Sequence, residues 1–241
     1  MIDAAWQSQF ARTPVAITVR SYNNCRVGRP SRNVDRLLLR AGRELFPQTG
    51  AARLSVRKVA ELAGVNLGMF HYHFGSKELF VRRLLQEIYD EMFANLELAA
   101  SARDPREALR ASLNVLGGFA RDNAKLLRRL IADAMSGDNL AREFLRANMP
   151  RHVGVLLALI KSGQRAGALR KMAPPHALAF LAGSVAAPIV IGGALADHDL
   201  VPGVAAGLPA IIATDAAIAE RVDCALAGLA AKRVRRPRTA R

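Results

Sequence analysis

The sequence predicts an all-α protein. Most long stretches of the 241 residues place apolar side chains at helical spacing, and few segments alternate with the period of two that is typical of a strand. Ser, Asn and Asp precede several of these stretches and Gly follows them, as helix caps do. Hydrophobic residues make up 51% of the chain, so one large or two small domains can bury a sizeable core.

The first expected helix covers residues 32–46, and Pro47 and Gly50 close it. Its apolar residues recur at i, i+3, i+4 and i+7 and form one inward stripe. The members of that stripe are Val34, Leu37, Leu38, Ala41 and Leu45.

Two short helices follow within residues 55–75. Ser55 and Asn66 are N-cap residues, and Gly64 and Gly75 tolerate the positive φ that ends a helix. Ser76 then caps a long third helix. The predicted inward residues are Val56, Val59, Ala60 and Ala63 on the first short helix, and Leu67, Phe70 and Phe74 on the second. Because so short a pair cannot bury its own apolar face, the helix at 32–46 is expected to support it.

Two short helices joined by a tight turn are the layout of a helix-turn-helix DNA reader. The outward face of the second helix carries Gly68, Met69, His71 and Tyr72, with no carboxylate. Gly68 costs about 1 kcal/mol relative to Ala inside a helix. It is either simply tolerated near the helix start or needed because the backbone closely approaches a DNA groove.

These segments resemble the TetR family of bacterial regulators over residues 32–80. The resemblance rests on LF-x-x-x-G at the end of the first helix, VAELAGV in the second, and GMFHYHFGSKEL from Gly68 onward. It implies a three-helix DNA-binding domain and a helical domain that binds a ligand and forms a homodimer. It also implies a repressor that leaves a palindromic operator when the ligand binds.

The resemblance also implies roles for individual residues. Arg57 matches a position that reaches a base edge, and its guanidinium suits guanine. His71 and His73 match phosphate-contacting positions, and Lys77 matches a phosphate clamp at a helix N-terminus. The family usually has a hydroxyl residue at the position of Met69 and tyrosine at that of His71. The full predicted DNA-binding set is Arg57, Lys58, Asn66, Leu67, Gly68, Met69, His71, Tyr72, His73 and Lys77.

Charge is distributed unevenly along the chain. The net charge of +15 comes mainly from residues 26–83, which hold 12 basic and 4 acidic side chains, and from the last ten residues, which hold 6 basic and none acidic. Residues 84–231 hold 15 of each. Positive charge confined in this way attracts phosphate and predicts strongly salt-dependent DNA binding.

The remaining chain reads as further helices. They are expected at about 76–100, at 105–122 after Asp104, at 123–135, at 138–166 with a kink or break at Pro150, at 174–196, and at 209–231. The predicted organisation is a mobile basic arm at 1–30, a DNA-binding domain at 31–78, a ligand-binding and dimerisation domain at 79–231, and a basic tail at 232–241. Each basic end is either a solvated segment or an extra DNA contact.

Residues 177–196 carry no charge and are long enough to span a bilayer. Their Ala- and Gly-rich composition and Pro188 favour instead a fully buried helix that another helix approaches closely. With the small residues of the last helix, this segment resembles the pair through which TetR-like proteins dimerise. The predicted dimer residues are Gly183, Ala187, Gly192, Ala213 and Ala217.

Effector-binding residues carry no motif. The candidates are the larger side chains of the second domain, for which ordinary core packing is the alternative, and a pocket among them favours an apolar or aromatic ligand. Arg128, Arg129 and Arg146 are either solvated or able to bind an acid. The candidates are Phe93, Leu113, Leu116, Phe119, Met135, Phe144, Met149, His152 and Phe180.

Other functional classes have less support. The chain lacks a nucleophile elbow, a phosphate-binding loop, a dinucleotide motif and paired metal ligands, so neither an enzyme nor a metal or cofactor site is expected. Two distant cysteines, Cys25 and Cys224, indicate a reducing, cytoplasmic location. The alternatives are a non-specific nucleic-acid-binding protein, which the charge alone would explain, and a membrane-associated helical protein.

Overall fold

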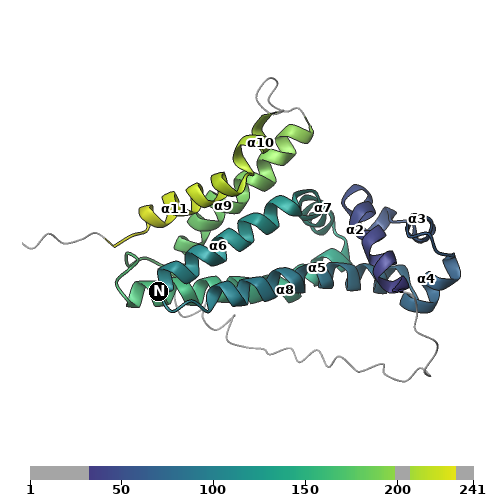
Figure 1. Cartoon of the computed structure of the whole chain (residues 1–241), viewed down its shortest axis with the longest axis horizontal. Coiled ribbons are helices and arrows are strands. Elements are labelled where there is room, and N and C mark those ends of the chain that lie inside the picture. The colour runs from purple at the N-terminus through teal and green to yellow at the C-terminus, as the bar shows by residue number, and fades with distance from the viewer. Residues whose placement is uncertain (1–32, 199–206, 232–241) are drawn as a thin grey trace, which may run out of the picture.

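A computed structural model describes residues 33–198 and 207–231, so the predicted arm at 1–30 and the tail at 232–241 lie outside the described residues (Figure 1). The predicted all-α fold is confirmed: these residues form ten helices, and their one β-bridge joins Leu169 to Ala230. The helices are α2 (Val34–Arg53), α3 (Val56–Leu62), α4 (Leu67–Phe74), α5 (Lys77–Ala100), α6 (Pro105–Asp122), α7 (Ala124–Met135), α8 (Asn139–Arg165), α9 (Pro174–Asp197), α10 (Leu208–Ile212) and α11 (Asp215–Gly228).

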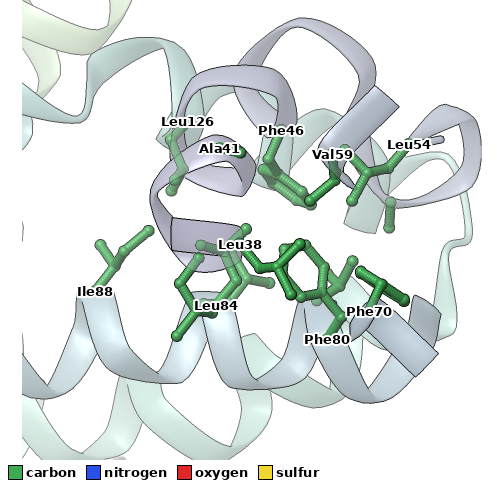
Figure 2. Packing of buried hydrophobic residues seen from close by; sticks show 14 of the residues in the cluster. Leu38, Ala41, Phe46, Leu54, Val59, Phe70, Phe80, Leu84, Ile88 and Leu126 are labelled. Atoms are coloured by element: carbon green, nitrogen blue, oxygen red, sulfur yellow. The ribbon is translucent and has the colours of Figure 1, made fainter. Parts of the chain in front are cut away.

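Helices α2, α3 and α4 pack with the first half of α5 at one end of the molecule (Figure 1). Figure 2 shows the aromatic centre of this unit, where Phe46, Phe70 and Phe80 are at most 1% exposed. The ring centroids of Phe70 and Phe80 lie 5.0 Å apart, which ties α4 to α5. We call residues 34–85 the reader, and its core also includes Ile88 of α5 and Leu126 and Leu130 of α7.

The predicted caps of the reader are present. Ser55 accepts a hydrogen bond from the Lys58 amide (3.4 Å), Asn66 from the Met69 amide (2.9 Å), and Ser76 from the Leu79 amide (3.2 Å). Gly64 and Gly75 adopt φ values of 67° and 69°, which L side chains rarely adopt. Each turn of the reader is therefore set by local chemistry.

Three expectations for the reader are wrong in detail. The first helix does not end at residue 46, because α2 continues through Pro47 and changes direction at Gly50, where φ is 68° and ψ is 179°. Leu37 and Leu67, which were expected to face inward, are 43% and 40% exposed. Each lies at the edge of an apolar stripe whose central residues already fill the small core.

The body consists of α6 to α11 together with the second half of α5. Helix α6 lies between α5, α8, α9 and α11, and their facing leucines, isoleucines and valines form a second core. Asp104 caps α6 through the Glu107 amide (2.8 Å) and Pro105 starts it, as predicted. The long α5 belongs to both units, since Phe80 and Leu84 lie in the reader core and Met92 and Leu96 in the body.

Three expectations for the body need correction. Helix α8 runs without a break through Pro150, which removes only one amide donor from a 27-residue helix. The last helix is split into α10 and α11, because Thr214 caps a new helix through the Ala217 amide (3.1 Å). Helix α9 is not fully buried: only one face of it lies in the core, at Ala177, Leu181, Val185, Ile189 and Gly192.

Candidate functional site

Helices α3 and α4 present the outward face that the sequence assigns to DNA. Arg57 and Lys58 are exposed on α3, and the Arg57 Nε atom lies 3.0 Å from Glu61 Oε1. This pair is 80% and 62% exposed at its two side chains. An exposed ion pair contributes little, about 0–1 kcal/mol. The Arg57 guanidinium is therefore free to exchange Glu61 for another acceptor at small cost.

The first turn of α4 gives a backbone surface rather than a row of side chains. Asn66 uses its side-chain oxygen to cap the helix, so that oxygen is already occupied. Gly68 is exposed, and a Cβ there would lie 3.2 Å from Asn66 Oδ1. Leu67 is exposed beside it, whereas Met69 packs partly on the reader core. A groove can thus approach the backbone at Gly68 with Leu67 as an apolar neighbour.

The four remaining predicted DNA contacts differ in their availability. Tyr72 is 73% exposed, and His71 is exposed with its Nδ1 atom 3.2 Å from the Gly75 carbonyl. His73 is only partly exposed, and its Nε2 atom is buried without a partner among the described residues. The Lys77 ammonium donates to the Ala52 carbonyl (2.9 Å), which fastens the end of α2 to the start of α5.

A second candidate site is an apolar cavity of about 540 Å³ inside the body. Helices α5, α6, α7, α8 and α9 all contribute to its wall. Six of the nine predicted effector residues line it, namely Leu113, Leu116, Phe119, Phe144, Met149 and His152. Phe93, Met135 and Phe180 are not among its lining residues, and Met135 and Phe180 are 81% and 44% exposed.

The polar end of this cavity was only partly found from sequence. Tyr89 on α5 donates to the Asn148 carbonyl on α8 (2.8 Å), and its hydroxyl oxygen lies 3.4 Å from His152 Nδ1. Burial raises the pKa of Tyr89 to about 12 and lowers the pKa of His152, because both charged forms lose hydration. Tyr89 and Asn148 have no distinctive sequence context, so only the packing of α5 on α8 reveals them.

The arginines that were considered as acid ligands do not enter the cavity. Arg128 pairs with Asp197, Arg129 pairs with Asp133, and Arg146 is exposed. Arg151 instead stacks over the outer side of Tyr89 and Phe93, at 5.1 Å and 4.1 Å from the ring centroids. None of the residues that line the cavity is Lys, Arg, Asp or Glu.

The two units meet at a junction made by Gly50 and Ala51 of α2 with Arg129 and Asp133 of α7. The carboxylate of Asp133, which is 7% exposed, accepts from the Ala51 amide (3.3 Å) and lies 2.8 Å from Arg129 Nη2. A Cβ at residue 50 would collide with Arg129 Nε and Asp133 Oδ2. The same helix α7 lines the cavity with Leu126, Leu127 and Leu130.

The outer face of α9 and α11 carries small and apolar side chains. Phe180 and Ile191 are 44% and 57% exposed, and Gly183 has open space where a Cβ would stand. Ala187, Ala213 and Ala217 are half-buried, whereas Gly192 is buried, where a Cβ would lie 2.7 Å from Ile212 Cδ1. The missing side chain of Gly192 therefore lets α10 of the same chain pack closely against α9. Helix α9 is also the one described helix long and apolar enough to cross a membrane, by length and composition only.

Comparisons with known proteins give the same picture. Residues 38–84 match the family model of bacterial regulatory proteins, tetR family. The HTH-type transcriptional repressor NicS of Pseudomonas putida is 29% identical over 136 residues, which cover 55% of this chain and 64% of NicS. This chain thus spans slightly less than two thirds of that relative.

Two solved structures share the fold. A TetR-family transcriptional regulator from Mesorhizobium loti has a TM-score of 0.56 and 19% identity, with coverage of 84% of this chain and 100% of that one. The regulator FadR from Bacillus subtilis, solved in complex with stearoyl-CoA, has a TM-score of 0.59 and 14% identity, with coverage of 80% and 98%. Residues 38–84 thus match the family of bacterial regulatory proteins, tetR family, and the described chain shares its all-helical fold with these two regulators.

Proposed function

We propose that this protein is a cytoplasmic, homodimeric repressor that binds a palindromic operator and leaves it when a small apolar or aromatic molecule fills the body cavity. One observation carries the proposal: a capped helix-turn-helix with an exposed reading face is joined, through shared helices, to an apolar cavity. A protein that merely bound nucleic acid through charge would need neither the turn nor the cavity.

Base reading is assigned to the exposed residues of α3 and α4. The Arg57 guanidinium suits the two hydrogen-bond acceptors of guanine in the major groove, and Gly68 lets the backbone approach the bases. Lys58, His71 and Tyr72 are exposed beside them and suit phosphate or base contacts. Asn66 and Lys77 support these contacts indirectly, since the first caps α4 and the second fastens α5 to α2.

Dimerisation is assigned to the outer face of α9 and α11. A half-exposed helix with Phe180, Gly183 and Ile191 on its outer face favours close packing against another helix. Two readers placed one turn of DNA apart would read both halves of a palindrome. Their joint binding exceeds that of one reader because the second contact becomes intramolecular.

Coupling between the cavity and DNA is assigned to α5 and α7. Leu85 and Ile88 of α5 and Leu126 and Leu130 of α7 line the cavity and also belong to the reader core. A ligand that moves these side chains therefore shifts α2, because the Asp133–Ala51 hydrogen bond connects α2 to α7. The ligand acts by binding one arrangement of the two readers better than the other. A ligand in this position is supported by FadR of Bacillus subtilis, which shares the fold and was solved in complex with stearoyl-CoA.

The test is fluorescence anisotropy at near-physiological salt, with labelled DNA from upstream of the protein's own coding region and random duplex as competitor. A sequence-specific regulator survives the competitor, because it prefers its site by about 10³-fold or more. A protein that binds through charge alone is removed by it. If upstream DNA fails, selection from random duplexes decides the matter, and a selection that enriches no sequence contradicts the proposal.

Two variants separate base reading from phosphate binding. Arg57→Ala is expected to cost about 1–3 kcal/mol on the operator and to relax the preference at one base pair. Lys58→Ala is expected to weaken operator and random DNA alike and to flatten the salt dependence. Equal losses on both DNAs for both variants would contradict the assigned role of Arg57.

A further inference from the structure

The wall of the body cavity is uncharged, and its polar groups gather at one end. Apart from Tyr89, Asn148 and His152, its lining side chains are apolar. A charged group held there would lose its hydration without gaining an ion pair, which is strongly unfavourable. We propose that the cavity selects an uncharged, largely apolar molecule that carries one hydrogen-bond donor, such as a hydroxyl group, and that His152 Nε2 accepts this hydrogen bond. This inference rests on the proposed effector role of the cavity.

The hydrogen bonds at the polar end of the cavity determine which atom carries each proton. A carbonyl oxygen only accepts, so Tyr89 spends its one hydroxyl hydrogen on the Asn148 carbonyl at 2.8 Å. The contact of the same hydroxyl with His152 Nδ1 at 3.4 Å then requires the histidine to donate. His152 therefore holds its proton on Nδ1, toward α5.

The side chain of Asn148 has no N–H donor left for a ligand. Its amide nitrogen donates to the Phe144 carbonyl (3.0 Å) and to Gln86 Oε1 (3.3 Å). Its amide oxygen accepts from Gln86 Nε2 (3.3 Å). With Asn148 and the Tyr89 hydrogen both engaged, the described residues at this end provide no free donor.

His152 provides the free hydrogen-bond acceptor at this end of the cavity. Burial lowers its pKa, so the ring is neutral near pH 7, and a neutral ring protonated at Nδ1 has a bare acceptor at Nε2. No hydrogen bond from the described residues reaches that atom. The guanidinium of Arg151 stacks on the Tyr89 ring, pairs with Asp90 at 3.3 Å, and is not among the lining residues of the cavity. A ligand hydroxyl is thus matched, whereas a carboxylate meets neither a donor nor a cation.

The experiment compares three probes on one naphthalene skeleton: 1-naphthol, 1-methoxynaphthalene and 1-naphthoate. Each competes with the neutral fluorescent reporter N-phenyl-1-naphthylamine for the full-length protein at neutral pH. We expect 1-naphthol to bind about fivefold more tightly than the methoxy compound, because one net hydrogen bond contributes about that factor. The naphthoate should bind at least tenfold more weakly than 1-naphthol. Naphthoate binding as tight as naphthol binding, or no binding of 1-naphthol, overturns the inference.

The variant His152→Phe keeps an aromatic ring and removes the acceptor. It should bind the reporter but lose the preference for 1-naphthol over 1-methoxynaphthalene. The control Met149→Leu alters another lining side chain without touching a polar group and should keep the preference. A preference that survives in His152→Phe overturns the role of Nε2.

Failure of this inference is distinct from failure of the proposed function. Ligand selectivity is read from reporter displacement without DNA, whereas regulation is read from operator anisotropy with saturating 1-naphthol. Selective binding without any change in operator affinity would contradict ligand control by this probe and leave the assigned chemistry standing. Release of the operator by 1-naphthoate with the same potency would overturn the assigned chemistry and support ligand control.

Discussion

The reader and the body differ in how completely their cores are filled. The reader fills a small core with Phe46, Phe70 and Phe80 and places a cap or a left-handed glycine at each turn (Figure 2). The body, built largely from Leu, Ala and Val, keeps a cavity of about 540 Å³ and leaves one face of α9 half exposed. The reader core is closely filled and is completed by Leu126 and Leu130 of α7, whereas the body keeps an apolar cavity and an exposed apolar face.

This difference indicates how the functions are divided. A closed, aromatic core holds α3 and α4 in fixed geometry, which base reading requires. A hollow body made of long helices can rearrange at low cost, since fewer contacts are lost when its walls move. Helices α5 and α7 contribute residues to both units, so we expect movement in the hollow unit to reach the rigid one.

The largest expected effect is a difference in the free energy of unfolding between two leucine-to-alanine variants, one in each unit. Leu38→Ala in the reader core is expected to lower the free energy of unfolding by about 4 kcal/mol, because a fully packed site leaves a new cavity. Leu113→Ala, on the existing cavity wall, should cost about 2 kcal/mol, since one side of that leucine already lacks contacts. Urea unfolding followed by circular dichroism measures both. Equal costs would mean that the body is as tightly filled as the reader.

The next largest expected effect, on dimerisation and operator affinity, concerns the exposed apolar face of α9. Phe180→Glu places a charge on the outer face of α9 and is expected to convert the dimer to monomer in analytical ultracentrifugation. Operator affinity should then fall about 100-fold as the second contact is lost. Met135→Glu, at an apolar side chain that is 81% exposed elsewhere on the body, is the matched control and should remain dimeric. A dimeric Phe180→Glu protein would argue against this interface.

The junction between the units can be probed with two glycines of similar φ. Gly64→Ala meets open space and should cost about 1 kcal/mol for the left-handed backbone alone. Gly50→Ala combines a backbone conformation that is nearly restricted to glycine (φ 68°, ψ 179°) with a collision with Arg129 and Asp133, and should cost about 2–3 kcal/mol. Thermal unfolding ranks the two. Equal losses would show that α2 does not rest on α7 as described.

The smallest expected effect is a pH dependence that originates in the body. Because burial lowers the folded-state pKa of His152, the unfolded chain binds a proton that the folded chain refuses as the pH falls below about 6.5. Stability should therefore decrease on acidification, by less than about 1.4 kcal/mol per pH unit. The Tyr89 hydroxyl faces His152, and the Asn148 carbonyl opposes part of the lowering of its pKa. The variant His152→Phe should show a shallower pH dependence of urea unfolding than Met149→Leu, and an identical dependence would contradict this origin.

Most of the reader was predictable from sequence because its signals are local. Ser55, Asn66, Ser76, Gly64 and Gly75 each act on the backbone within a few residues of themselves. The exceptions, Leu37 and Leu67, lie at stripe edges, where helical spacing alone does not decide between core and surface. The predicted DNA-binding residues lie on α3, on α4 with its N-cap, and at the start of α5. Whether each is free depends on tertiary contacts, since Lys77 donates to Ala52, 25 residues away.

The helical fold, the turn between α3 and α4 and the basic charge of the reader were predictable, since each follows from short-range geometry or composition. Tertiary packing was needed to identify which large side chains of the body surround empty space, because Phe144 and Phe93 both fit a helical apolar pattern and only Phe144 lines the cavity. It also decided that Asp133 meets Ala51, 82 residues away, and that Tyr89 meets His152. Such pairs depend on how whole helices pack, which no local pattern encodes.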